Sequence, residues 1–417
     1  MRPPLTLIKG ARLYASSREV DVLFSNVILA LGNHIPEPKG IAVELYDAEG
    51  RLLVPGLIDL HTHPIGGGGE AGPTSRVPEL SLTEIVTGGI TTLVGCLGTD
   101  DVTRHLESLL AKVRALSTQG ITAYMYTGSY QVPPPTLTGS VRRDLVLIPE
   151  VLGVGEIAIS DHRSSQPTLE ELARIAAEAR VGGMLAGKKG VVHLHVGAGQ
   201  RGLSPLFRLV GETGIPILQF HPTHVGRTAD LLDEAIEWAK QGGTFDLTAP
   251  SATLSWDRPF PEIVRRLERA GVPWDRVTIS SDGGGSMPKF DGTGNLVGFA
   301  TGRPASLWQA VRTLVKEGYP LECVLPLVTE NPARVLGIAG RKGSIEEGKD
   351  ADLLVLGEDL SIERVYAKGR LLVEEGKPGE RGHIEQGPGR EAPPGLSREG
   401  TLPGAGNPGS FRPPPRD

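Results

Sequence analysis

From about residue 57 onward, short apolar runs alternate with amphipathic stretches, and this alternation limits the folds open to the chain. The apolar runs predict eight strands, at 58–63, 91–97, 123–127, 157–160, 191–196, 217–221, 244–247 and 277–281. Helical patterns lie between most of them, at 102–116, 169–180, 203–211, 228–240 and 261–270. Strands that alternate with helices pair in parallel through right-handed crossovers. The sequence therefore predicts an α/β fold, a (β/α)8 TIM-like barrel.

An open, doubly wound sheet that binds a dinucleotide is the alternative fold. Residues 197–202 fit the pattern Gly-X-Gly-X-X-Gly and follow a predicted strand. The next predicted strand, however, ends in His221, where an acidic residue that binds the ribose is expected. We therefore favour the barrel.

Both ends of the chain predict a second, smaller unit. Short strand patterns separated by glycines occur at 5–8, 21–24, 27–31 and 41–46, and again at 352–356, 362–367 and 369–373. We expect a small β-sandwich domain built from residues 1–54 and 339–377, with the barrel over 55–338. Residues 378–417 are rich in Gly, Pro, Arg and Glu with almost nothing apolar, so we expect a disordered tail.

Composition excludes several classes of function. The formal net charge is -6 with both signs dispersed, so no basic surface for nucleic acid is expected. No run approaches the roughly 20 apolar residues of a membrane span, and residues 1–8 lack the apolar core of a signal peptide. The 2 cysteines cannot form a disulfide framework, which suits a reducing compartment. We expect a soluble cytoplasmic protein that binds neither nucleic acid nor membrane.

Metal-binding side chains recur at the carboxyl ends of the predicted strands, where barrel enzymes place their sites. In the first strand, His61 and His63 share a face and form a ready pair of ligands. Further candidates follow in chain order: Glu156, His162, His193, His195, His221, His224 and Asp282. We expect His193 to lie in the core or behind the ligands, and His221 to shape the loop that follows it.

This set of side chains suits hydrolysis assisted by two metals. Two zinc-class ions a few Å apart share a hydroxide, because binding lowers the pKa of the corresponding water to about 7. Glu156, on a facing strand, is the best-placed carboxylate to bridge both ions. Asp282 is placed to bind one ion and to pass a proton to a leaving amine. A glycine-rich loop at 66–69, followed by Glu70, leaves room for a ligand nearby.

Several motifs resemble those of a known superfamily. Pro-Gly-Leu-Ile-Asp-Leu-His-Thr-His at 55–63, Asp-Gly at 282–283, Asn-Pro-Ala at 331–333 and the segment 343–352 resemble the amidohydrolase superfamily. More narrowly, segments 66–73, 97–100, 127–130, 159–164, 222–225 and 280–283 resemble the isoaspartyl (β-aspartyl) dipeptidases. The resemblance covers nearly everything from about residue 5 to about residue 375.

The resemblance implies roles for particular residues. It implies metal-dependent cleavage of the isopeptide bond of β-aspartyl dipeptides by a homo-oligomer, an octamer in this family. Two Zn²⁺ ions are implied per chain, with Asp282 also carrying the proton. The implied metal ligands are His61, His63, His195, His224 and Asp282. The implied substrate contacts are Glu70 for the α-ammonium group, Tyr130 for the scissile carbonyl, and Arg163, Arg227 and Ser286 for the carboxylates; Thr99 is also implied to bind substrate. A β-aspartyl dipeptide carries one ammonium and two carboxylates, which one acidic residue and two arginines match.

One position departs from the family pattern. The family bridges its metals with a carboxylated lysine, and the matching position here is Glu156. Its arm is several bonds shorter, so either the strand lies closer to the metals or the second metal binds poorly. We predict two metals bridged by Glu156, without lysine carboxylation.

Two other functions remain open from the sequence. One is a cyclic-amide hydrolase of the hydantoinase or dihydroorotase type, which shares the metal motif but has no need of the loop that carries Glu70. The other is a catalytically silent barrel kept as a scaffold, which would be expected to lose metal ligands, whereas every expected ligand type is present.

Overall fold

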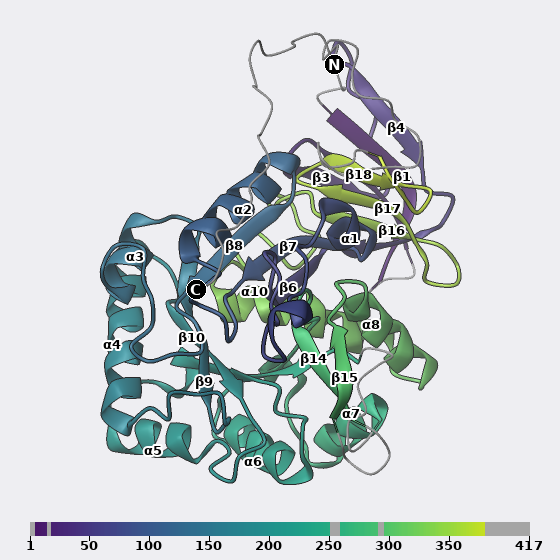
Figure 1. The fold of residues 1–417 in the computed structure, drawn as a ribbon. Coiled ribbons are helices and arrows are strands. Elements are labelled where there is room, and N and C mark those ends of the chain that lie inside the picture. The colour runs from purple at the N-terminus through teal and green to yellow at the C-terminus, as the bar shows by residue number, and fades with distance from the viewer. Residues whose placement is uncertain (1–4, 15–17, 251–258, 291–295, 380–417) are drawn as a thin grey trace, which may run out of the picture. The chain divides into compact units, whose positions relative to one another are not determined.

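A computed structural model describes residues 5–14, 18–250, 259–290 and 296–379 (Figure 1). Almost all of the expected tail, 378–417, lies outside these residues. All of the predicted site residues lie within them.

Eight strands run through the described part of the barrel. They are β6 (Leu57–Thr62), β7 (Ile90–Gly95), β8 (Thr122–Thr127), β9 (Val151–Ile159), β10 (Val191–Val196), β11 (Phe220–Thr223), β12 (Phe245–Thr248) and β13 (Val277–Ser280). Strands β6 to β11 form one parallel sheet in chain order, and β12 pairs in parallel with β13. A parallel bridge from Thr62 to Gly283 joins the last strand to the first. The predicted (β/α)8 fold is confirmed.

Helices alternate with these strands. They are α1 (Leu82–Thr87), α2 (Leu106–Gln119), α3 (Val141–Leu147), α4 (Leu169–Ala186), α5 (Ser204–Glu212), α6 (Ala229–Lys240), α7 (Phe260–Arg269), α8 (Ser306–Lys316), α9 (Leu321–Val324) and α10 (Glu330–Leu336). Thr168 and Glu171 form a capping box that begins α4, and Thr228 caps α6. Apolar side chains of the helices bury against the strands in one large cluster. Each helix in the described residues is too short or too polar to cross a membrane.

Local differences from the predicted elements have physical causes. Residues Ile217–Gln219 form a 3-10 turn after Pro216, so the sixth strand starts at Phe220. Strand β9 begins at Val151, earlier than predicted, because its glycines hide it in the sequence. A Cβ atom at Gly153 would collide with the backbone of β10, so a glycine is needed there for close strand packing. A hairpin of β14 (Ser286–Phe290) and β15 (Leu296–Thr301) follows β13.

Both chain ends contribute to a second sheet, as predicted. Its strands are β1 (Leu5–Leu13), β2 (Glu19–Phe24), β3 (Ile28–Gly32), β4 (Val43–Asp47), β5 (Leu52–Pro55), β16 (Leu353–Leu356), β17 (Ile362–Ala367), β18 (Arg370–Glu374) and β19 (Lys377–Pro378). They form one nine-stranded, mostly antiparallel sheet, in which the antiparallel pair of β5 and β16 brings the two chain ends together. Figure 1 shows the C-terminal strands β16, β17 and β18 in the same sheet as β1, with β5 between β16 and β1.

Strand β5 leads directly into β6, so this sheet fixes where the first barrel strand begins. Gly56 lies between the two strands, where a Cβ atom would collide with Thr91 of β7. Just before β16, the buried ammonium of Lys342 lies 2.9 Å from Asp350 and 2.5 Å from Asp352. At the entry of β13, Asn331 donates hydrogen bonds of 2.7 Å to the carbonyls of Trp274 and Val277. These contacts anchor the strands at the end of the barrel opposite the site.

Candidate active site

The predicted metal ligands gather at the carboxyl ends of five barrel strands. His61, Glu156 and His195 lie within β6, β9 and β10, and the others follow directly after β6, β11 and β13. His224 and Asp282 have backbone φ angles of 64° and 50°. Residues other than glycine seldom adopt this conformation, and it concentrates at functional sites, where the surrounding fold maintains it. These turns place both side chains within the cluster.

Glu156 connects two pairs of histidines. Its Oε2 lies 3.2 Å from His61 Nε2 and 3.6 Å from His63 Nε2. Its Oε1 lies 2.7 Å from His195 Nδ1 and 3.3 Å from His224 Nε2. Each carboxylate oxygen therefore faces a different pair of imidazoles.

A bulge in β9 directs this side chain. Val154 and Ile157 of β9 pair with Val192 and Leu194 of β10, so two residues of β9 oppose one of β10. Such bulges bend a strand and change the direction of a side chain. The extra residue lies where Glu156 enters the cluster, and it brings the shorter arm within reach of all four histidines.

Asp282 completes the cluster from the opposite side. Its Oδ1 lies 3.2 Å from His63 Nε2 and 3.7 Å from His61 Nε2. Asp282 is 8% exposed, and this oxygen has no hydrogen-bond partner in the described structure. A buried carboxylate oxygen without a donor, beside imidazole nitrogens, is typical of a cation site. The residues present therefore fit divalent metal ions.

The electrostatics of the cluster favour positive charge. Burial alone would raise the pKa of Glu156, but the charge of His61 and hydrogen bonds from His195 and His224 hold this pKa well below its usual value. Burial likewise opposes ionisation of Asp282, yet His63 and His61 lower its pKa to about 2. The pKa of His61 is raised despite burial, chiefly by Glu156. Two carboxylates thus stabilise positive charge between them, whether protons or metal ions carry it.

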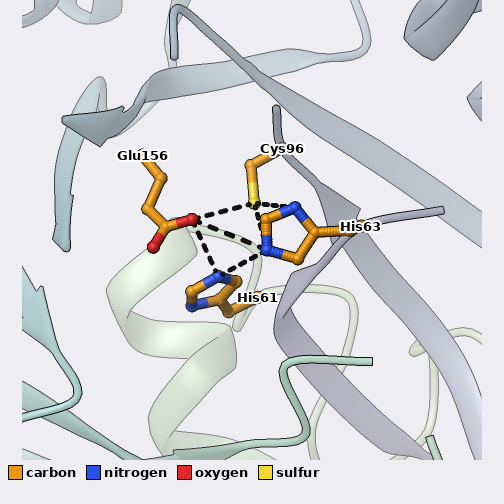
Figure 2. A group of neighbouring side chains, drawn as sticks. All are labelled: His61, His63, Cys96 and Glu156. Atoms are coloured by element: carbon orange, nitrogen blue, oxygen red, sulfur yellow. Dashed lines mark hydrogen bonds and ion pairs between the residues drawn. The ribbon is translucent and has the colours of Figure 1, made fainter. Parts of the chain in front are cut away.

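Two residues at the site were missed by sequence reasoning. Cys96 follows β7, with its Sγ 3.9 Å from Glu156 Oε2 and 4.0 Å from His63 Nε2 (Figure 2). Asp161 accepts hydrogen bonds of 2.8 and 2.9 Å from the Arg163 guanidinium and lies 2.9 Å from His195 Nε2. A signal existed for Asp161, which lies two residues before Arg163 in the 159–164 motif, whereas Cys96, within the predicted strand 91–97, has the pattern of a core residue.

The cluster opens into a pocket. The six predicted substrate contacts all line this pocket: Glu70, Thr99, Tyr130, Arg163, Arg227 and Ser286. The structure thus brings together side chains from loops far apart in the sequence.

Glu70 is the acidic group of this pocket. It accepts hydrogen bonds from Thr99 at 3.1 Å, Ser286 at 3.0 Å and Arg163 at 3.3 Å. Arg163 and Arg227 line the same pocket, and Glu70 is its carboxylate outside the histidine cluster. Arg227 also lies 4.0 Å from Asp161.

The glycine-rich loop that carries Glu70 is tied to the barrel. Gly66 and Gly68 have positive φ angles, and a Cβ atom at either position would collide with the backbone of residues 75–78. The buried guanidinium of Arg104 donates to the carbonyls of Ile65, Gly67 and Val77. The glycines therefore allow close backbone packing, and Arg104 fixes the loop.

Three histidines of the candidate set lie outside the carboxylate cluster. His193 Nε2 lies 3.2 Å from His61 Nδ1, behind the ligand. His221 lies between the hydroxyls of Thr244 at 2.9 Å and Thr278 at 3.0 Å. His162 is exposed.

Comparison with known proteins agrees with this geometry. The model of the amidohydrolase family matches residues 52–372, most of the chain. The chain belongs to the amidohydrolase family. The chain is similar to a solved structure, the β-aspartyl dipeptidase of the thermophilic keratin-degrading Fervidobacterium islandicum AW-1 in complex with β-Asp-Leu. The two sequences are 45% identical, and the structures superpose with a TM-score of 0.86 over 91% of this chain and 99% of that chain. The resemblance drawn from the motifs is confirmed.

More distant relatives in the family act on other compounds. Imidazolonepropionase from Methylobacterium sp. (strain 4-46) is 26% identical, with 82% of this chain and 88% of that protein covered. Adenine deaminase 3 from Rhizobium meliloti (strain 1021) is also 26% identical, and the match spans 81% of this chain but only 51% of that protein. A D-hydantoinase structure at 17% identity and a TM-score of 0.64 shares the fold alone.

Proposed function

We propose that this amidohydrolase cleaves the isopeptide bond of β-aspartyl dipeptides. The observation that carries the proposal is the position of Glu156, which joins two pairs of histidines. It lines a pocket in which Glu70 and two guanidinium groups lie outside the histidine cluster. A β-aspartyl dipeptide presents the complementary charges, one ammonium and two carboxylates. The similar dipeptidase of Fervidobacterium islandicum was solved with such a dipeptide bound, which supports this assignment.

We further propose that the site holds two Zn²⁺ ions. The ligands would be His61, His63, His195, His224 and Asp282, with Glu156 between the ions in place of a carboxylated lysine. Imidazole and carboxylate donors suit zinc. When bound, such ions acidify a water molecule and polarise a carbonyl group.

The side chains of the chain supply the remaining steps. Asp282, whose pKa is low and which is therefore ionised, accepts a proton from the attacking water and gives it to the departing amine. Burial and the charge of Glu156 raise the pKa of Tyr130 well above its usual value, so its hydroxyl keeps the proton that it donates to the scissile carbonyl. Tyr130 OH lies 2.7 Å from His195 Nδ1, at the edge of the cluster.

The pocket residues orient the substrate. Glu70 receives the α-ammonium group, and Thr99, which donates to Glu70, holds that carboxylate in place. Arg163 and Arg227 bind the substrate carboxylates, with Ser286 beside them. An α-linked dipeptide places its ammonium and carboxylates differently, so this arrangement favours the β-linked isomer.

We also propose a cytoplasmic homo-oligomer, an octamer as the family resemblance implies. Apolar side chains that are exposed on neighbouring helices support assembly: Leu147 at 56%, Met184 at 69% and Leu185 at 67%. Light scattering on the purified protein measures the assembly directly.

The experiment that tests the proposed activity compares β-Asp-Leu with α-Asp-Leu on zinc-reconstituted protein, with bound metal counted on the same sample. Cleavage of the β-linked dipeptide alone, with near two metals per chain, is the expected result. Two metals without cleavage would point to another amide substrate at the same site. No metal and no cleavage would favour the silent scaffold.

A further inference from the structure

We infer that Cys96 is an additional ligand of the metal ion held by His61 and His63, bound as a thiolate. The inference rests on the proposed metal centre and goes beyond the ligand set that the sequence motifs imply. Coordination releases the thiol proton to solvent, so no other reactant is needed.

The donor atoms already have the spacing of a small metal site. Zinc–nitrogen bonds of about 2.0–2.1 Å and zinc–sulfur bonds of about 2.3 Å place tetrahedral ligands roughly 3.3–3.6 Å apart. His61 Nε2 and His63 Nε2 are 3.3 Å apart, and Glu156 Oε2 lies 3.2 and 3.6 Å from them. Cys96 Sγ lies 3.9 Å from Glu156 Oε2 and 4.0 Å from His63 Nε2. All four donors lie within 4.8 Å of one another, so the widest pair needs to close by at most about 1.2 Å to reach tetrahedral spacing around an ion.

Cys96 approaches this cluster from the side that faces away from the pocket. Figure 2 shows its sulfur pointing between His63 and Glu156. Cys96 is 1% exposed, and the described residues that line the pocket include Glu156 and Asp282 but not Cys96. The thiolate therefore leaves the pocket side of the ion open to water and substrate.

Asp282 gives an independent indication that a cation belongs here. Its unpartnered Oδ1 points at the same two imidazoles from the pocket side. With Asp282, the two histidines, Glu156 and Cys96 would give an ion five protein donors, one more than a tetrahedral set.

A thiolate has two consequences for the site. It adds a negative charge beside Glu156 and so strengthens the binding of a cation there. Sulfur also favours soft or borderline metals such as zinc and cadmium over magnesium and manganese. The competing account is a structural thiol, which donates only to the Thr62 carbonyl at 3.3 Å.

Absorption spectroscopy on the Co²⁺-loaded protein separates these accounts. A thiolate ligand gives a near-ultraviolet sulfur-to-cobalt charge-transfer band, and we expect this band in the wild-type protein. Cys323 is the other cysteine of the chain and is exposed, so Cys323→Ser is the matched control and should keep the band. Cys96→Ser should lose it and bind the ion about tenfold or more weakly.

The possible results distinguish the role of Cys96 from the proposed function. Bound cobalt without the band in wild-type protein, with β-Asp-Leu still cleaved by the zinc form, would overturn the role of Cys96 and leave the proposed function standing. A band that persists in Cys96→Ser would also overturn it. Failure to bind any metal, together with no cleavage, would overturn both. If Cys96→Ser does not fold, the wild-type and Cys323→Ser spectra decide.

Discussion

Replacing Glu70 by glutamine tests how the pocket recognises its substrate. The change keeps the length of the side chain and removes its charge. A hydrogen bond between charged partners contributes about 1.5–3 kcal/mol in proteins. Arg163 Nη1 already lies 3.3 Å from Glu70 Oε1 and partly neutralises it, so the lower part of that range applies. A loss of about 1.5–2 kcal/mol corresponds to a roughly 10- to 30-fold lower kcat/KM for β-Asp-Leu.

The assay compares two substrates that differ only in the ammonium group. Succinyl-leucine is β-Asp-Leu without its α-amino group, so Glu70→Gln should lower its kcat/KM less than about 3-fold. Glu79→Gln is the control, since Glu79 is exposed, pairs with Lys112 at 3.1 Å and does not line the pocket. Equal losses on both substrates would refute the assignment of Glu70 to the ammonium group.

Three further substitutions have expected outcomes. Glu156→Gln should lower the metal content, measured by mass spectrometry, from near two ions per chain to one or fewer. Arg104→Met removes the donor to the carbonyls of Ile65 and Val77 at about 1–3 kcal/mol each, whereas Gly67 O keeps its hydrogen bond from Val77 N. KM for β-Asp-Leu should therefore rise about tenfold or more, and Arg114→Met at an exposed ion pair should not change it. Asp350→Asn should destabilise the protein in urea by about 3 kcal/mol at pH 7, the low end for a broken buried ion pair, because Lys342 keeps its contact with Asp352. Burial opposes ionisation of Asp350, but Lys342 holds the pKa of Asp350 below 3.8. The ionised Asp350 therefore stabilises the protein above pH 3.8, and the effect of the substitution should shrink as the pH falls toward 3.

The barrel could be predicted because its strands and helices have strong periodic patterns. The start of β9 could not be predicted, since Gly153 and Gly155 interrupt the apolar run. Glycines are needed at these positions because β10 approaches closely, which only the structure shows. Several predicted site residues lie at strand ends, and parallel strands bring those ends together whatever the detailed packing. Local periodicity and topology were therefore enough to predict most of the fold and the location of the site.

Contacts between distant loops were beyond the sequence. Cys96 has the pattern of a core residue, because a cysteine at the end of an apolar strand is usually buried and inert. Arg104 lies just before α2, and nothing in the sequence indicates that it holds the carbonyls of a loop some 30 to 40 residues earlier. The reach of Glu156 depends on a bulge in β9, which the spacing of residues does not reveal.

Anomalous X-ray diffraction from crystals of the zinc-loaded protein tests directly whether Glu156 joins two metal ions. We predict two anomalous peaks per chain, with one Glu156 oxygen about 2.0–2.2 Å from each. The first ion should lie beside His61 and His63, and the second beside His195 and His224. A single peak, or two ions that Glu156 does not join, would contradict the central claim that this carboxylate replaces the family's carboxylated lysine.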